Sequence, residues 1–480
     1  MSPEAIALNR FGLGARPSQP APADARAWLN TQLARFDPRP QALAPVPPRD
    51  QVVAQLADYM TEQRMEARAK RQPMAQPASM QTDVNQDGLP DSARKFLRQS
   101  IREDYLVMTG ARMSAALASE TPFVERLVHF WANHFAISAD KLPVIGLAGL
   151  LEFEAIRPNV LGKFPDMLLA VEQHPAMLIY LDQAQSIGPN SRAGQFIAMR
   201  GQQKRGLNEN LAREIMELHT LGVRTGYSQA DVTEFARALT GWTVGGLAQG
   251  PARRLLGDTT PGQFQFAEML HEPGERMIMG KRYTQDGQAQ ARAVLADLAA
   301  NPATARHLAT KLARHFAGDD PPPAMVGRLT QAYLRSGGDL PTVYRAIIDS
   351  PEAWAAGPLK FKTPWEWSVS ALRAVGQQQA EPQMAANLLN QLGQPTWRPG
   401  SPAGYDDIAA SWAAPEALML RVDVAQRIAD RAAASVDARA LAEKLFPGSL
   451  SEGTRTAIAR AESPAEGLAL LLVSPEFVRR

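Results

Sequence analysis

The sequence predicts an all-α fold, a single large multi-helical domain with one small inserted β-hairpin. Apolar residues recur at helical spacing through most of the chain, and alanine, a strong helix former, is abundant among them. No fixed-period repeat and no sharp linker divides residues 1–480. In residues 263–283, polar and apolar residues alternate instead, and Pro273-Gly274 is typical of a turn. This pattern predicts the hairpin.

The apolar spacing predicts the helices in order along the chain. They cover residues near 22–36, 49–70, 93–119, 122–136, 144–155, 159–172, 209–221, 229–240, 286–299, 302–316, 322–336, 340–349, 364–376, 382–392, 414–432, 438–446, 453–461 and 465–473. Proline, glycine and polar residues gather between some of them. This predicts flexible loops near 36–49, 72–91 and 243–262.

The composition is that of a globular protein and excludes several classes. Apolar residues make up 45% and charged residues 21% of the chain, unlike a disordered protein. The net charge is only +2, whereas a dedicated nucleic-acid binder would show a concentrated basic stripe. We therefore expect no nucleic-acid partner. The chain has no cysteine, which excludes disulfides, thiolate nucleophiles and cysteine-ligated metal centres.

We expect no membrane insertion, because no apolar run reaches the ~18 residues of a membrane span. The start, MSPEAIALNRFGLGARP, lacks the basic and apolar regions of a secretory signal. A cytoplasmic location is therefore expected. A cysteine-free chain suits the periplasm as well, and that location stays open.

Residues 208–242, NENLAREIMELHTLGVRTGYSQADVTEFARALTGW, form the clearest pattern and predict two capped helices. In the first helix, Asn210, Glu214 and Glu217 form one polar stripe, and Arg213 is placed to pair with Glu217. If the stripe faces a cleft, one carboxylate stays ionised and its crowded neighbour is pushed toward protonation. Glu214 and Glu217 are then a catalytic acid/base pair. A surface helix with ordinary ion pairs is the alternative.

The second helix begins with a capping box, Ser228-x-x-Asp231, and ends near Gly241. Arg237 near its end is a candidate for anion binding, or else a structural bridge between the two helices. The full set of candidate binding residues is Asn208, Asn210, Arg213, Arg237, Trp242 and His271.

Two further patterns concern metals. His129 and His134 are five residues apart, about 140° around a helix, so they do not chelate one ion, and we expect His134 to be a hydrogen-bonded core residue. Residues 83–91, DVNQDGLPD, match the start of a calcium loop, but position 12 is arginine rather than glutamate. Either the loop binds calcium weakly or it is a plain polar turn, and no cofactor is required. The calcium ligands would be Asp83, Asn85, Asp87 and Asp91.

Several blocks resemble one bacterial family, the domain-of-unknown-function family 1800 (DUF1800). They are Arg10-Phe11-Gly12, ERLVHFWANHF (125–135), HPAMLIYLDQAQSIGPNS (174–191), residues 208–242, HEPGERMIMG (271–280), KLARHFAGDDPPP (311–323), KFKTPWEWSVSALRAVG (360–376), LGQPTWRPGSPAGY (392–405) and SPEFVRR (474–480). The resemblance implies a mainly helical fold and no established reaction. It also implies a partner protein similar to the alkaline phosphatase and sulfatase fold. The DVNQDGLPD loop is not part of the family's pattern.

Three classes of function stay open, and the sequence does not decide whether the chain is an enzyme. The working hypothesis is a carboxylate-dependent hydrolase that uses Glu214 and Glu217 on a glycan or similar polymer. The first alternative is a non-catalytic scaffold that acts with a phosphatase- or sulfatase-like partner. The second is a metal-dependent enzyme, in which His134, His219 or His271 meets one of these carboxylates.

Overall fold

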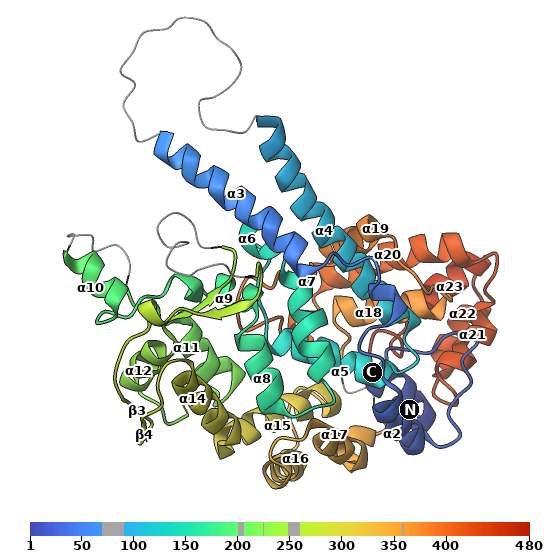
Figure 1. Ribbon diagram of the computed structural model, residues 1–480. Helices are drawn as coiled ribbons and strands as arrows, with labels where there is room; N and C mark the ends of the chain where they lie inside the picture. Colours follow the sequence, from blue (N-terminus) through green and yellow to red (C-terminus); the bar gives the residue numbers. More distant parts are fainter. Residues whose placement is uncertain (70–90, 200–205, 224, 248–259, 358–359) are drawn as a thin grey trace, which may run out of the picture.

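The computed structural model describes residues 1–69, 91–199, 206–223, 225–247, 260–357 and 360–480 (Figure 1). Helices account for 61% of the chain, and the described residues add only two small two-stranded sheets. The prediction of an all-α fold with a small β insertion is confirmed. No helix of the described residues is long and apolar enough to cross a membrane.

The first half of the chain is built from eleven-residue and longer helices mixed with short ones. In order they are α1 (Pro3–Ile6), α2 (Ala25–Arg35), α3 (Arg49–Ala69), α4 (Asp91–Ala118), α5 (Pro122–His134), α6 (Leu142–Ile145), α7 (Ala148–Leu150), α8 (Phe164–Glu172), α9 (Pro175–Tyr180), α10 (Arg192–Met199), α11 (Asn210–Glu214) and α12 (Gln229–Leu239). In Figure 1, α3 and α4 project side by side from the body of the molecule. Three π-helical segments interrupt this half: Ala7–Phe11, Leu151–Ile156 and Ile215–His219.

The second half is almost entirely helical. Its helices are α14 (Gln288–Ala300), α15 (Pro302–Ala317), α16 (Pro323–Ser336), α17 (Leu340–Asp349), α18 (Pro364–Ala374), α19 (Pro382–Gln391), α20 (Pro415–Ala432), α21 (Ala438–Leu445), α22 (Glu452–Ala459) and α23 (Pro464–Leu472). Many begin with proline behind a capping side chain, because proline fixes the helical φ and lacks the amide that would go unbonded. Thr363, Asn301 and Ser463 cap α18, α15 and α23 in this way.

The β structure differs from the predicted hairpin of residues 263–283. β2 (Phe264–Phe266) pairs antiparallel with β1 (Trp242–Val244), which precedes it by some twenty residues in the chain. The hairpin consists of β3 (Arg276–Ile278) and β4 (Lys281–Tyr283). Its turn is at Met279 and Gly280, not at Pro273-Gly274, because both residues have the positive φ that a tight two-residue turn requires.

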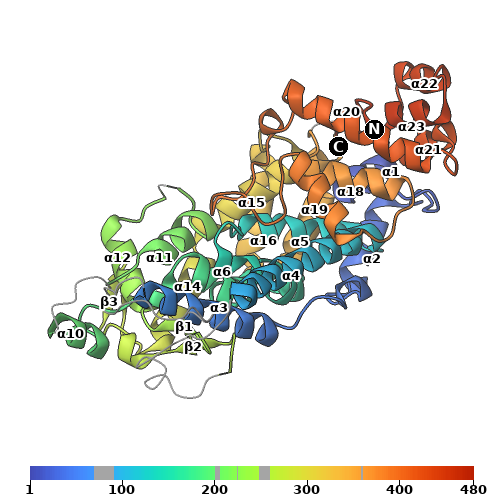
Figure 2. The same cartoon turned by 90° about the horizontal axis from the view of Figure 1, so that it is seen from above.

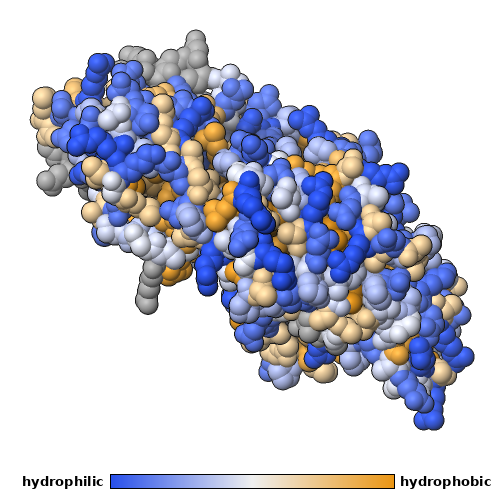
Figure 3. Space-filling view, turned by 90° about the horizontal axis from the view of Figure 1, so that it is seen from below, coloured by the Kyte–Doolittle hydropathy of each residue, from blue (hydrophilic) through white to orange (hydrophobic). Residues whose placement is uncertain are grey.

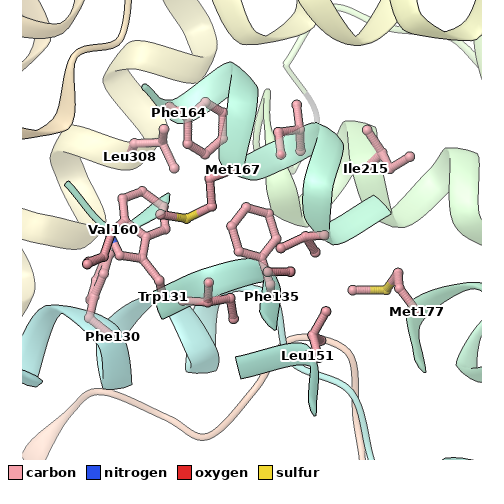
Figure 4. Close-up of a cluster of buried hydrophobic side chains, with 14 of the residues drawn as sticks. Phe130, Trp131, Phe135, Leu151, Val160, Phe164, Met167, Met177, Ile215 and Leu308 are labelled. Carbon is pink, nitrogen blue, oxygen red and sulfur yellow. The ribbon is translucent and has the colours of Figure 1, made fainter. Parts of the chain in front are cut away.

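Buried apolar side chains form two clusters. The larger joins α5, α8, α11, α12 and α14–α17, and Figure 4 shows Trp131, Phe135, Phe164, Met167 and Ile215 gathered in it. The smaller cluster joins the N-terminal residues to α18–α23. Figure 2 shows an elongated molecule with α21–α23 at one end and α10 and β3 at the other. On the face in Figure 3, apolar groups are scattered among polar ones.

Candidate functional site

The predicted helix at residues 209–221 is α11 continued by the π-helical turn Ile215–His219. Leu211, Ile215 and Leu218 follow one another at i, i+4 and i+7, the spacing of one face of a regular helix. Leu211 and Ile215 are buried, but Leu218 is only partly buried. The wider π turn places one extra residue in the helix, so Met216 and His219 face the core instead. Turns of this kind often occur where a side chain serves a function.

The predicted polar stripe lies on the partly exposed side of this helix. Asn210 is exposed, while Glu214 and Glu217 are partly buried. Arg213 contacts Glu209, at 3.3 Å between Nη2 and Oε2, and not Glu217. Within the described part of the chain neither carboxylate of the stripe has an ion-pair partner. Burial raises the pKa of Glu214, and the charge of Glu217 adds to the rise.

Asn208 and Arg237, two of the predicted binding residues, make contacts that hold the local structure together. Asn208 donates to the Leu181 carbonyl at 3.1 Å and accepts from the Asn210 amide at 2.8 Å, which positions the start of α11. Arg237 forms an ion pair with Glu234 on its own helix. The capping box of α12 is formed as predicted.

Trp242 and His271 lie near the C-terminal end of α12. Trp242 is 1% exposed in β1, and its ring contacts Phe264 edge-to-face with centroids 5.1 Å apart. His271 is buried, with Nδ1 2.9 Å from the Thr240 carbonyl oxygen. In the part of the chain that the structure describes, no side-chain hydrogen bond or ion pair joins a predicted binding residue to Glu214 or Glu217.

The predicted calcium loop falls on residues that the structure does not describe. Asp83, Asn85 and Asp87 lie outside the described residues, and Asp91 is the first residue of α4. Among the residues that are described, no group of three or more His, Asp or Glu side chains is arranged to hold a metal ion.

A cavity of about 320 Å³ lies between α5, α15, the start of α18 and the loop 394–407. Its wall is unusually rich in basic groups and aromatic rings. The lining side chains include Arg112, Arg126, His129, His134, His307, Lys311, Arg314, His315, Trp365, Glu366, Trp397, Tyr405, Asp406 and Asp407. Glu214 and Glu217 do not belong to this wall.

At the centre of the basic wall, Nζ of Lys311 lies 3.0 Å from Nδ1 of His134. The other ring nitrogen of His134, Nε2, lies 3.2 Å from the carbonyl oxygen of His219. A carbonyl only accepts, so Nε2 carries the hydrogen and Nδ1 presents its lone pair to Lys311. His134 is buried and hydrogen-bonded, as the sequence predicts. Burial, with the charge of Lys311 nearby, holds the pKa of His134 well below its usual range.

Lys311 has an unusual environment for a lysine. Burial lowers its pKa to about 8, and Asp407 only partly opposes this effect. No carboxylate of the described residues lies within ion-pair distance of its Nζ. The Lys311 amine is therefore far easier to deprotonate than an ordinary lysine, whose pKa is about 10.4.

Two neighbouring histidines hold this wall in place. His307 donates from Nε2 to the Leu218 carbonyl at 3.1 Å, and burial together with Lys311 lowers its pKa to about 4. His219 is fully buried, with Nδ1 2.7 Å from Oε1 of the equally buried Glu172. The π-helical turn thus supplies both carbonyls, those of residues 218 and 219, that fix the tautomers of His307 and His134.

Two arginines present free donors to the cavity. The Nε of Arg112 donates to both oxygens of Glu152, at 3.0 and 2.8 Å, while its Nη nitrogens bond to none of the described residues. Its guanidinium lies over the Trp365 ring, 4.1 Å from the centroid. Among the described residues, Arg314 donates only from Nε, to the Asp319 carbonyl at 3.3 Å. Both guanidinium groups therefore have donors left for an anionic ligand.

The floor of the cavity is a closed ionic network. Glu366 accepts from Arg126 and, at 2.9 Å, from Arg480. Arg126 also donates to the Gly12 carbonyl from two nitrogens. All three nitrogens of Arg126 thus already donate to protein acceptors. Although burial opposes ionisation, Arg480 and Arg126 hold the pKa of Glu366 well below its usual range.

A second cavity, of about 910 Å³, lies under the predicted loop 36–49. It contains one acid, Glu154, which is shared by Arg49 at 3.3 Å and His174 at 3.4 Å. Because the charge of Glu154 is already neutralised, this cavity has no unpaired carboxylate among the described residues.

An exposed apolar patch lies on α20. Leu418, Met419 and Val422 are 37%, 63% and 43% exposed. A scaffold protein is expected to carry such a patch together with carboxylates neutralised by arginines. Glu214 and Glu217 have no arginine partner within ion-pair distance among the described residues.

Lys311, Arg314 and His307 were not among the predicted site residues. They share one face of α15 at i, i+4 and i+7, the same spacing that marked the stripe of α11. The signal was therefore present in the sequence. The contact between Lys311 and His134 could not be seen in the sequence, because the two residues are 177 positions apart and only the tertiary fold brings them together.

Comparison with known proteins identifies the family. No curated protein and no solved structure matches the chain. The sequence profile described as "Protein of unknown function (DUF1800)" matches residues 6–479, nearly the whole chain. The protein therefore belongs to the DUF1800 family.

Proposed function

We propose that the chain is an enzyme that binds a small anionic substrate in the 320 Å³ cavity and transfers protons through Lys311 and His134. The observation that carries the proposal is the 3.0 Å contact between Lys311 Nζ and His134 Nδ1. A lysine without a carboxylate partner, next to an imidazole lone pair, is poised to give and take protons near neutral pH.

The free guanidinium nitrogens of Arg112 and Arg314 supply the recognition of charge. Arginine forms paired hydrogen bonds with carboxylates and phosphates, and these are stronger where water is excluded. A cavity of this size suits a metabolite rather than a polymer chain. Trp365 and Tyr405 provide apolar walls on which the uncharged part of the substrate packs.

Ligand protection tests this function directly. Acetic anhydride modifies free amines, and peptide mass spectrometry reads the modification of Lys311 separately from that of Lys141. Lys141 is the control because it is half-exposed and paired with Asp182, outside the cavity. Phosphate or a small carboxylate should slow acetylation of Lys311 and leave Lys141 unchanged. Equal rates at Lys311 with and without every anion would refute the proposal.

A matched variant separates charge recognition from folding. Arg314→Gln removes a half-buried guanidinium whose one hydrogen bond is long, so the fold should persist. Losing one charge-assisted contact should weaken anion protection on the order of tenfold. Arg306→Gln, an exposed change on the same helix, should leave protection unaltered.

The glycan hydrolase is the second candidate. Its support is that burial raises the pKa of Glu214, as a general acid requires, and that Glu217 beside it is unpaired among the described residues. Glu214→Gln and Glu217→Gln should each abolish release of reducing sugar from a glycan panel. Glu268→Gln, an exposed control without an ion-pair partner among the described residues, should not. Unchanged release in both test variants rejects this candidate.

A further inference from the structure

The neighbour of Lys311 is a proton acceptor, and this arrangement points to a specific reaction. We propose that Lys311 forms an imine with a carbonyl compound that also carries an anionic group, such as an oxo acid or a phosphorylated ketone. The inference rests on the proposed function of the cavity and names its substrate class and its chemical step.

Imine formation needs a neutral amine with a base beside it. The Lys311 nitrogen attacks the carbonyl carbon, and the π electrons of the C=O bond move to the oxygen. One amine hydrogen passes to Nδ1 of His134 and from there to the oxygen. The hydroxyl takes the second hydrogen and leaves as water while the C=N bond forms. Both amine hydrogens and the carbonyl oxygen are thus accounted for, and no oxidant or reductant is needed.

The hydrogen bonds of His134 prepare this transfer. Its Nε2 is held by the His219 carbonyl at 3.2 Å, so Nδ1 is the nitrogen that accepts. The His219 ring is in turn fixed by Glu172 at 2.7 Å. A lysine that served only as a base would not need a second base in contact with its nitrogen. A nucleophilic lysine must pass on a proton as it attacks. His134 relays this proton rather than keeping it, because burial holds its own pKa well below the usual range.

The free donors near Lys311 select the anionic group. Arg314 is three residues further along α15, which places it on the same helix face, roughly 5–6 Å away between Cβ atoms. Arg112 approaches from α4, across the cavity. A substrate whose carbonyl and anionic group are one or two bonds apart reaches the amine and a guanidinium together. An uncharged aldehyde or ketone lacks this second contact.

Hydrogen bonds fix two aromatic side chains of the cavity wall. Trp365 donates from Nε1 to Nδ1 of His129 at 3.1 Å, and Trp397 donates from Nε1 to Glu152 at 2.9 Å. The Arg112 guanidinium lies over both rings, 4.1 Å from the Trp365 centroid and 5.4 Å from the Trp397 centroid. These large, fixed side chains reduce the room for water beside the C=N bond.

Borohydride trapping tests the inference on the full-length chain. Sodium borohydride reduces an imine to a stable secondary amine, which peptide mass spectrometry assigns to one lysine. The probes are pyruvate, which carries a carboxylate, and dihydroxyacetone phosphate, which carries a phosphate. Acetone is the uncharged control. We expect a reduced adduct on Lys311 with one or both charged probes, at least about tenfold above acetone, and none above background on Lys141.

Three variants sharpen the result. Lys311→Met keeps the length of the side chain and should abolish the adduct. Arg314→Gln should raise the probe concentration for half-maximal trapping on the order of tenfold. His134→Gln keeps a polar side chain and should slow trapping without shifting that concentration. Circular dichroism verifies that each variant is folded.

Two outcomes overturn the inference. The first is trapping on Lys311 that is no greater than on Lys141 for every probe. The second is equal trapping with acetone and the charged probes. If phosphate still protects Lys311 from acetylation in either case, the proposed function stands and only the imine fails. If protection is absent as well, both fail.

Discussion

Glu366 anchors the floor of the cavity, and Glu366→Gln is the sharpest test of that role. Gln still completes the capping box with Thr363 at the start of α18, because glutamine serves that position as glutamate does. The change therefore removes only the negative charge that faces Arg126 and Arg480. Removing one partner of a buried ion pair costs about 3–5 kcal/mol. Arg126 and Arg480 keep their backbone hydrogen bonds, so we expect about 3 kcal/mol.

The sign of the pH dependence follows from the same contacts. Arg480 and Arg126 hold the pKa of folded Glu366 below its unfolded value, despite burial. Its ionisation therefore stabilises the fold above the unfolded pKa of about 4.3, and this contribution is lost as the pH falls toward the folded pKa. The difference between wild type and Glu366→Gln should be largest at pH 7 and shrink below pH 4.

Urea unfolding followed by tryptophan fluorescence measures this difference at both pH values. Glu443→Gln is the control, because its partner Arg455 and Glu443 itself are about half-exposed and such pairs contribute little. A loss below about 1 kcal/mol at pH 7 would refute the reasoning. A loss of the same size well below pH 4 and at pH 7 would refute its electrostatic part.

Three further changes test the fold. Trp131→Phe removes the 2.7 Å hydrogen bond to the Tyr344 hydroxyl and should lower the free energy of unfolding by about 1–2 kcal/mol in urea denaturation. Gly280→Ala places a Cβ at φ +76° in the β3–β4 turn and should cost about 1 kcal/mol, read as a lower thermal midpoint. Ser228→Ala removes half of the capping box with Asp231 and should cost about 1 kcal/mol, with faster amide exchange in the first turn of α12.

Matched controls accompany these changes. Trp412→Phe, in a less buried indole, and Gly453→Ala, at a helical glycine with open space, should each shift stability by less than their counterparts. Exchange in α12 that is unchanged by Ser228→Ala would contradict the capping argument.

Local signals were enough to predict most of the helices. α12 begins at its predicted capping box, and Val232, Phe235 and Leu239, which recur at helical spacing, are fully buried. Such features depend on neighbours within one or two turns, so they can be seen in the sequence. The prediction for β2 was incomplete because its partner β1 is only three residues long and twenty residues away.

The candidate cavity could not be predicted from local patterns. The π-helical turn inserts a residue that the regular 3.6-residue period does not allow for. As a result, His219 is buried and Leu218 is only partly buried, the opposite of what the regular period predicts. The pairing of Lys311 with His134 depends on the packing of α15 against α5. A stripe of charges on a helix shows which groups lie together, but not whether solvent or a cavity faces them.

The pH dependence of Lys311 acetylation tests the central claim most directly, because it measures the protonation state of the amine in the intact chain. The modification rate of the Lys311 peptide is followed across the pH range and divided by the rate of a free-amine standard. The structure predicts a midpoint at a pH of about 8. A midpoint near the ordinary lysine pKa of about 10.4 would contradict the claim that the cavity holds a reactive amine.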